Sequence, residues 1–236
     1  ISLVKWFMAM YLISSHKKGV SSHQLSRDLS VTQKTAWFIL HKVRTLFAQD
    51  DSDILKGEVE LDEMYLGGRE TNKHESKKTP STQGRSTKTK TPIFGMVARH
   101  GTAHAFVVED TKAETLKPYI QQFCNDNAHL FTDELSSYSC LDKMGYAHDV
   151  IEHGKRQFFN GKGVTTNSIE GFWGQFKRMV FGTYHFVSKA YLQRYVDEAV
   201  YRYNTRYMKE ADRFSYMFDK AIGKVQYKDV KIQDVV

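Results

Sequence analysis

The chain has 236 residues, 41% of them hydrophobic and 13% aromatic, which is enough for one sizeable folded domain and a smaller one. Its longest apolar stretch, around Trp6–Ile13, is shorter than the roughly 18 residues that cross a bilayer, and no signal-peptide pattern opens the chain. A net charge of +7 and an isoelectric point near 9.2 favour contact with polyanions such as nucleic acid. These features exclude a membrane-spanning protein, and we expect a cytoplasmic one.

The cysteine usage agrees with that compartment. Cys124 and Cys140 form neither a spaced zinc-binding set nor a disulfide framework. We interpret them as isolated thiols in a reduced setting.

The first 47 residues predict helices. Ser21 and Gln24 have the spacing of a capping box, which indicates the start of a short helix. Residues 30–32 interrupt the pattern and can cap a following helix. That second helix turns a set of apolar side chains inward: Ala36, Ile39, Leu40, Val43 and Phe47.

A short helix, a tight turn and a longer helix are the elements of a helix-turn-helix motif. The start of the longer helix enters the major groove in that motif, so Gln33, Lys34 and Thr35 are candidate DNA contacts. The same pattern also fits an ordinary helical bundle. We interpret residues 1–50 as a DNA-binding region because the chain is basic and because of the domain that follows.

After a polar, acidic linker at residues 48–56, the apolar period changes from helical to alternating. Glu58–Asp62 predicts a strand, and its strand region ends near Gly67. Residues 69–91 are rich in Lys, Ser and Thr, which is typical of a solvated mobile loop or of a flexible basic arm that binds phosphates. We interpret this segment as a mobile loop that also contacts DNA, with three candidate residues: Lys73, Lys77 and Lys78.

The remaining elements alternate between strands and helices. We expect strands at residues 93–98, 103–108, 129–132 and 150–151, and helices at residues 113–123, 136–144, 169–180 and 188–207. Ser168 is the expected cap of the helix at 169–180. This element order predicts a ribonuclease-H-like α/β domain at residues 57–210, a mixed sheet with flanking helices. It is preceded by the small all-α helix-turn-helix domain and followed by a tail at residues 211–236.

Three acidic residues fall at positions that this fold brings together. Asp62 lies in the first strand, Asp133 at the end of the fourth, and Glu170 in the first turn of a later helix. The first and fourth strands are neighbours in such a sheet. Converging carboxylates repel each other unless a cation lies between them, and hard oxygen ligands select magnesium or manganese. We therefore predict that they hold Mg²⁺ or Mn²⁺, as two ions ~4 Å apart that support in-line displacement at phosphorus.

Taken singly, each of these residues also has a plainer interpretation. An aspartate at a strand end is often a turn former, and a glutamate in a first helical turn often serves the helix dipole. Neighbouring acids are alternatives, namely Glu60, which shares the face of Asp62, Glu63, which points away, and Glu134. We favour Asp62, Asp133 and Glu170 over these alternatives. The reasons are the order of the three acids, the types of element that carry them and the gap of 37 residues from Asp133 to Glu170.

Two residues near Glu170 are further candidates for the active site. Lys177 follows it by seven residues, two turns along the same helix face, where it can reach a phosphate beside the metals. The alternative is a surface lysine. Asn167, three residues before Glu170, can cap the helix or contact metal-bound water.

Several blocks of the sequence form motifs that are specific enough to compare with known families. They run from Gly57 to Gly68 with residues 72–74, through residues 131–134 with Tyr138, and from Thr166 to Trp173 with Lys177 and Arg178. These blocks resemble the three catalytic blocks of the ISXO-like group of bacterial insertion-sequence DDE transposases. Residues 182–185, 192–195 and 202–206 resemble the tail of that family, and residues 25–29 and 31–37 resemble its DNA-binding helices.

This resemblance covers about residues 5–207 and implies a ribonuclease-H-like catalytic domain, divalent metal and DNA with terminal inverted repeats as substrate. It gives catalytic roles to Asp62, Asp133 and Glu170. Asn167 is held in reserve for the third position, Lys177 is the trailing basic residue, and Arg178 is a DNA contact. Family members usually begin with a cysteine-rich zinc ribbon, which is absent from this sequence, and we expect a missing upstream part.

We therefore predict a transposase that cuts at the ends of its element and joins the 3′-hydroxyl to target DNA. We expect a homo-oligomer on paired ends, associated with the nucleoid and without a membrane partner. One alternative is a catalytically inactive or domesticated DNA-binding protein derived from a transposase. Another is a ribonuclease-H-like nuclease or junction resolvase, against which residues 171–177 and the helix-turn-helix pattern argue.

Overall fold

The computed structural model describes residues 1–67, 74–79, 86–151 and 166–221. They belong to two compact units, which are described separately below. The helical unit comprises Ile1–Gln49 and Gly174–Val236, and the sheet unit comprises Asp50–Trp173.

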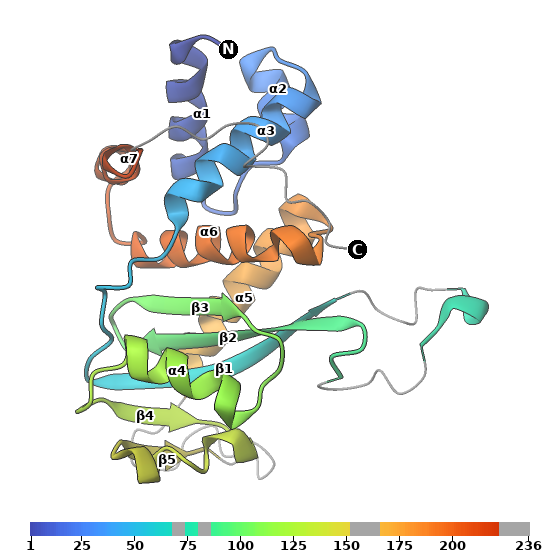
Figure 1. Cartoon of the computed structure of the whole chain (residues 1–236). Coiled ribbons are helices and arrows are strands. Elements are labelled where there is room, and N and C mark those ends of the chain that lie inside the picture. Colours follow the sequence, from blue (N-terminus) through green and yellow to red (C-terminus); the bar gives the residue numbers. More distant parts are fainter. Residues whose placement is uncertain (68–73, 80–85, 152–165, 222–236) are drawn as a thin grey trace. The chain divides into compact units, whose positions relative to one another are not determined.

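The sheet unit is built on five strands. They are β1 (Glu58–Gly67), β2 (Lys90–Ala98), β3 (Ala103–Val107), β4 (His129–Thr132) and β5 (Ala147–Val150). Their order in the sheet is β3-β2-β1-β4-β5. The first three strands pair antiparallel, whereas β1, β4 and β5 are parallel. An antiparallel meander beside parallel strands is the ribonuclease-H-like arrangement, so the predicted α/β fold class is confirmed (Figure 1).

The two faces of this sheet have different cover. Side chains alternate along a strand, so Val59 and Leu61 point to one face and Glu60 and Asp62 to the other. Helix α4 (Ala113–Phe123) packs on the first face and closes an apolar core. That core includes Val59, Leu61, Phe94, Met96, Leu116, Ile120, Phe123 and Leu130. The first turns of α5 (Asn167–Met179) cover the other face, which carries the polar side chains (Figure 1).

The helical unit contains the predicted helix-turn-helix elements. Its helices are α1 (Leu3–Ser15), α2 (Ser22–Leu29), α3 (Gln33–Arg44), the end of α5, α6 (Leu192–Asn204) and α7 (Glu210–Asp219). The predicted caps of α2 and α3 are both confirmed. Ser21 Oγ accepts from the Gln24 N–H at 3.1 Å, and Thr32 Oγ1 accepts from the Thr35 N–H at 3.2 Å. No helix within the described ranges is long and apolar enough to cross a membrane.

One predicted element was wrong in kind, and one helix was not predicted. Residues 136–144 form two 3₁₀ turns, Ser136–Tyr138 and Asp142–Met144, instead of one helix. The Tyr138 side chain is drawn into the core, where its hydroxyl donates to Glu63, and this tertiary contact outweighs the helical pattern. Residues 210–219, expected in a tail, form α7 because Phe214 and Met217 join the apolar core of the helical unit.

Several boundaries also differ from the prediction, including β2, which begins at Lys90, and β5, which spans Ala147–Val150. Helix α5 begins at Asn167, so Ser168 lies inside its first turn and does not cap it. A five-residue π-helical turn, Val180–Tyr184, follows α5. The helix expected at 188–207 is a 3₁₀ turn, Lys189–Tyr191, followed by α6, which ends at Asn204.

A buried ionic network joins α3 to α6 within the helical unit. Arg44 Nε donates to Glu198 Oε2 at 2.8 Å, and the two side chains are 2% and 1% exposed. Arg202 Nη2 donates to Glu198 Oε1 at 2.6 Å, and the Tyr184 hydroxyl donates to the same oxygen at 2.8 Å. Burial raises the pKa of Glu198, but Arg44 and Arg202 lower it more, to about 2. Glu198 is therefore a buried carboxylate whose charge is matched by arginines.

Asp197, its neighbour on α6, is a partly buried carboxyl that predicts a pH-dependent stability. Burial raises its pKa to about 6, although Gln193 and Gln49 both donate to its Oδ1. The pKa of an aspartate is about 3.9 in the unfolded chain, lower than the folded value of Asp197. The protonated carboxyl therefore contributes stability that is fully present below about pH 3.9 and is lost as the pH rises through 6. Asp197→Asn keeps the accepting oxygen, so we expect the free energy of unfolding to rise by about 1–2 kcal/mol at pH 8 and to change little at pH 4.

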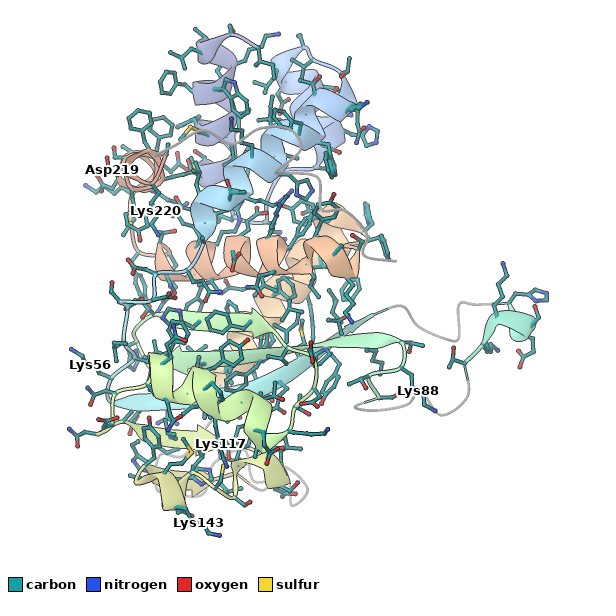
Figure 2. The ribbon with its side chains drawn as sticks, viewed as in Figure 1. Lys56, Lys88, Lys117, Lys143, Asp219 and Lys220 are labelled. Atoms are coloured by element: carbon teal, nitrogen blue, oxygen red, sulfur yellow. The ribbon has the colours of Figure 1, made fainter. Side chains whose placement is uncertain are left out.

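Urea titrations at the two pH values measure this difference. The matched control is Asp219→Asn, which removes a carboxylate exposed on α7 (Figure 2). An equal effect of both substitutions at pH 8 would contradict a specific burial cost at Asp197.

Candidate active site

Asp62 is held in place from the opposite layer of the sheet unit. It lies on β1 and its Oδ2 accepts a hydrogen bond from Trp173 Nε1, on α5, at 3.0 Å. Gly95 pairs with Asp62 across β1 and β2 and makes this approach possible. A Cβ at Gly95 would lie 2.5 Å from Trp173 Cζ2, which is closer than real contacts allow. The Asp62 carboxylate is therefore oriented by a buried indole that only a glycine admits.

The other two acidic residues approach from separate elements. Asp133 directly follows β4, and its Oδ1 accepts from the Leu135 N–H at 3.0 Å. Glu170 lies exposed in the first turn of α5, where its N–H donates to the Thr166 carbonyl at 3.1 Å. A strand end and a helix start thus bring two carboxylates toward the one on β1.

The three carboxylates meet at one pocket. A cavity of about 170 Å³ is lined by Asp62, Asp133, Glu170, Thr166 and Leu61. Burial and repulsion by Asp133, with a smaller contribution from Glu170, raise the pKa of Asp62 to about 6. The hydrogen bond from Trp173 acts in the opposite direction. Asp133 and Glu170 are therefore close enough to Asp62 to disfavour its charged form.

The neighbouring acids have other tasks. Glu60 is fully buried, accepts from the Ile169 N–H at 2.9 Å and from Arg99 Nε at 2.9 Å, and so ties the first turn of α5 to β1. Glu63 points to the other face and accepts from the Tyr138 hydroxyl. Glu134 is exposed and does not line the pocket. Of the candidate acids, Asp62, Asp133 and Glu170 are those that line the pocket.

The donor set of the pocket fits a divalent cation. All three side chains offer hard carboxylate oxygens, and a cation would relieve the repulsion that raises the pKa of Asp62. In the described residues, no group of three or more His, Cys, Asp or Glu side chains is already closed around one ion position.

The remaining predicted site residues lie elsewhere. Asn167 is exposed at the first position of α5 and is not among the residues that line the pocket. Lys177 and Arg178 are exposed on the part of α5 that belongs to the helical unit. Gln33, Lys34 and Thr35 open α3, where Gln33 Nε2 donates to Ser22 Oγ at 2.8 Å. Lys77 and Lys78 are exposed, Lys78 pairs with Glu75 at 2.5 Å, and Lys73 lies outside the described residues.

Three residues that shape the pocket were missed from the sequence. Glu60 was considered only as a rival of Asp62, although its place on the same strand face could have indicated support for the site. Trp173 lies three residues after Glu170, a helical spacing that could have drawn attention to it. Gly95 gave no usable signal, because its role depends on the pairing register of β1 with β2.

The Trp173 contact carries a testable consequence. Trp173→Phe keeps an aromatic ring against Gly95 and removes the N–H that orients Asp62. A hydrogen bond to a charged group contributes about 1.5–3 kcal/mol, so we expect metal-dependent DNA cleavage to fall about tenfold or more. Cleavage rates measured against Mg²⁺ concentration should show a weaker metal response, with Trp6→Phe in α1 as the matched control. Equal rates for the two variants would remove the positioning role of Trp173.

Strand order and the acidic pocket together define a ribonuclease-H-like protein with three carboxylates at one end of its sheet. The family model described as the ISXO2-like transposase domain matches residues 54–204, which is more than half of the chain. The chain belongs to this family, in agreement with the sequence blocks, and its role is that of a transposase. An uncharacterized transposase-like protein of Haemophilus influenzae is 26% identical over 106 residues, which cover 45% of this chain and 84% of that protein.

Two solved structures are loosely similar. A chain in the intasome of simian T-cell lymphotropic virus, in complex with the PP2A regulatory subunit B56 gamma, has a TM-score of 0.38 at 11% identity. That similarity covers 81% of this chain and 67% of the other. A chain in a pre-cleavage Mos1 transpososome has a TM-score of 0.33 at 12% identity, covering 87% and 75%. The fold assignment itself follows from the strand order and strand directions.

Proposed function

We propose that this transposase uses Asp62, Asp133 and Glu170 to cut DNA at the terminal inverted repeats of its element and to join the 3′ ends to target DNA. One observation supports the proposal most. Three carboxylates that are far apart in the sequence line a single pocket, and two of them raise the pKa of the third. An arrangement that costs stability without a ligand favours a site that holds cations.

In this proposal, the residues in and around the pocket have different roles. Asp62, Asp133 and Glu170 hold Mg²⁺ or Mn²⁺, in two sites, with Asn167 as the alternative for the third position. Divalent ions held by these carboxylates would supply the Lewis-acid chemistry for in-line displacement at phosphorus by water or a 3′-hydroxyl. Trp173 orients Asp62. Glu60 fixes the first turn of α5 and thereby the place of Glu170.

Several elements are proposed to bind the DNA around this site. The exposed start of α3 (Gln33, Lys34 and Thr35) reads the element end from the major groove, within a DNA-binding region at residues 1–50. The catalytic domain is proposed to span residues 57–210. Its basic segment at 69–91, together with Lys177 and Arg178, contacts phosphates. Two copies of the chain would hold the paired ends.

A cleavage assay on defined DNA tests this function. The full chain is incubated with Mg²⁺ and a duplex that ends in the terminal repeat of its element, and the products are separated by size. Cleavage at the repeat end followed by joining to a second duplex is the expected result. Binding without cleavage would point to a DNA-binding protein derived from a transposase, and preferential cutting of branched DNA would point to a resolvase. Either outcome would overturn the proposal.

A further inference from the structure

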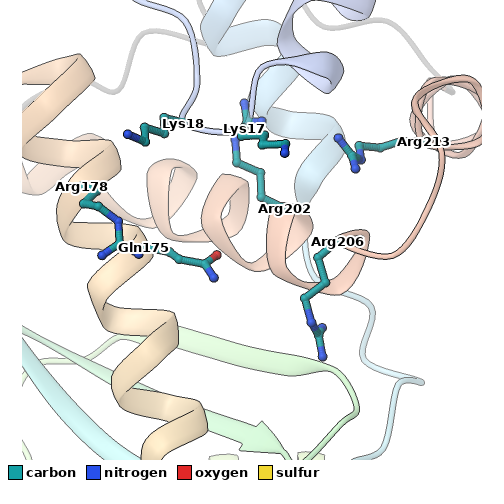
Figure 3. A pocket seen from close by; sticks show the side chains of 7 residues that line it. All are labelled: Lys17, Lys18, Gln175, Arg178, Arg202, Arg206 and Arg213. Atoms are coloured by element: carbon teal, nitrogen blue, oxygen red, sulfur yellow. The ribbon is translucent and has the colours of Figure 1, made fainter.

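The helical unit contains a strongly basic cavity that is separate in sequence from the acidic pocket. Its volume is about 390 Å³, and six cationic side chains line it together with Gln175. The six are Lys17, Lys18, Arg178, Arg202, Arg206 and Arg213, and Figure 3 shows that they come from the α1–α2 turn, α5, α6, the turn after α6, and α7. We propose that this cavity binds successive phosphates of the DNA backbone. The proposal rests on the proposed function in so far as DNA is the substrate.

Two of the six cations are held in place by hydrogen bonds within the fold and give the cavity a fixed positive charge. Arg202 Nη2 donates to the Ile13 carbonyl at 2.9 Å, and Arg213 Nη1 donates to the Ser14 carbonyl at 3.0 Å. They therefore satisfy carbonyls at the C-terminal end of α1, a helix with no basic residue in its own last turn. The Nε atom of Arg213 is nevertheless buried without a hydrogen-bond partner in the part of the chain that the structure describes.

Arg206 is held by aromatic rings. Its guanidinium lies 4.0 Å from the ring centroid of Tyr203 and 4.4 Å from that of Tyr207, and its Nη1 donates to the Tyr203 carbonyl at 2.7 Å. Stacking restrains the planar guanidinium while its N–H groups stay in the plane of the guanidinium, where a phosphate oxygen can accept from them. Arg206 is thus restrained before any ligand arrives.

The other three cations are exposed at the rim of the cavity. Lys17 and Lys18 follow α1, and Arg178 lies near the end of α5. Among the described residues, none of the three has a hydrogen-bond or ion-pair partner. Exposed cations around a fixed basic floor suit an extended anion that contacts the rim and the floor together.

The charge of the cavity favours a chain of phosphates over a single small anion. Glu198 is the carboxylate that pairs with Arg202, and it also serves Arg44. The positive charge that remains exceeds what one phosphate group, with about two negative charges, would neutralise. Among the residues that the structure describes, none of those that line the cavity offers an apolar side chain to a lipid tail or a nucleobase. Duplex DNA, with one phosphate per ~1.7 Å of helix axis, matches this chemistry.

Salt-dependent binding tests the proposal. The full-length chain is mixed with a labelled duplex of unrelated sequence in EDTA, so that neither the terminal repeat nor a divalent ion contributes, and the dissociation constant is measured by anisotropy against KCl concentration. For Lys17→Gln with Lys18→Gln, the slope of log affinity on log salt should become shallower by about 0.9 for each phosphate that the variant no longer neutralises. Arg178→Gln alone should reduce the slope by about 1.

The matched control removes two exposed lysines from the sheet unit. Lys56→Gln with Lys143→Gln changes the net charge equally, outside the cavity (Figure 2). A slope change equal to that of the control would overturn the proposal. So would inorganic pyrophosphate that displaces the duplex at equal ionic strength, or a duplex RNA that binds more tightly than the DNA. Because the assay has no cleavage step, a chain that fails to cut DNA can still pass it, and a chain that cuts DNA can fail it.

Discussion

Asp133→Asn is expected to reduce DNA cleavage by about 10³-fold or more, because a neutral amide is a poor ligand for the divalent ions and several kcal/mol of their stabilisation would be lost. The amide oxygen can still accept the hydrogen bond that the Leu135 N–H gives to Asp133 Oδ1. The fold should therefore survive, and duplex binding should persist. Single-turnover cleavage of an end-labelled terminal-repeat duplex, with and without Mg²⁺, measures the effect.

The neighbouring acid provides a sharp control for this prediction. Glu134→Gln removes one negative charge at the adjacent position, but its exposed side chain does not line the acidic pocket. We expect its cleavage rate to stay within about threefold of the unchanged chain, which corresponds to less than 1 kcal/mol. A comparable loss in both variants would show that general charge near β4, and not the Asp133 side chain, controls activity.

Glu198→Gln is expected to destabilise the protein by about 3–5 kcal/mol, because it leaves Arg44 as an uncompensated buried charge. Arg44 is 2% exposed, and its Nε donates to Glu198 at 2.8 Å. The change also removes the charged partner of Arg202. Urea unfolding followed by circular dichroism should show a large fall in the midpoint concentration. A loss below about 1 kcal/mol would contradict the importance of this network.

The pH dependence of this effect has a definite sign. The pKa of Glu198 is lowered to about 2, so its contribution is present above its unfolded pKa and is lost as the pH falls from about 4 toward 2. Glu198→Gln lacks that contribution throughout, so the two stability curves should converge at acid pH. The control is Glu210→Gln in the first turn of α7, an exposed position where we expect a change within about 0.5 kcal/mol.

Local patterns predicted much of the fold. Ser21 and Thr32 cap α2 and α3 as expected, since a cap involves residues only three positions apart. Alternation along β1 and the strand signals around it led to the right fold class, in which the first and fourth strands are neighbours. The prediction failed at residues 136–144, where the buried Tyr138 overrides a helical pattern, and at α7, whose apolar side chains needed a partner surface to form a helix.

The sequence by itself determined the family, the basic charge, the helix-turn-helix elements and the identity of three candidate acids, because these depend on residue types and on their spacing along the chain. Only the tertiary structure decided that Glu60 supports α5 while Asp62 faces the pocket, that Gly95 admits Trp173, and that Arg44 pairs with Glu198 across 154 residues. It also gathered six cations that are far apart in the sequence, from Lys17 to Arg213, into one cavity. Contacts of this kind depend on strand register and helix packing, which no local pattern encodes.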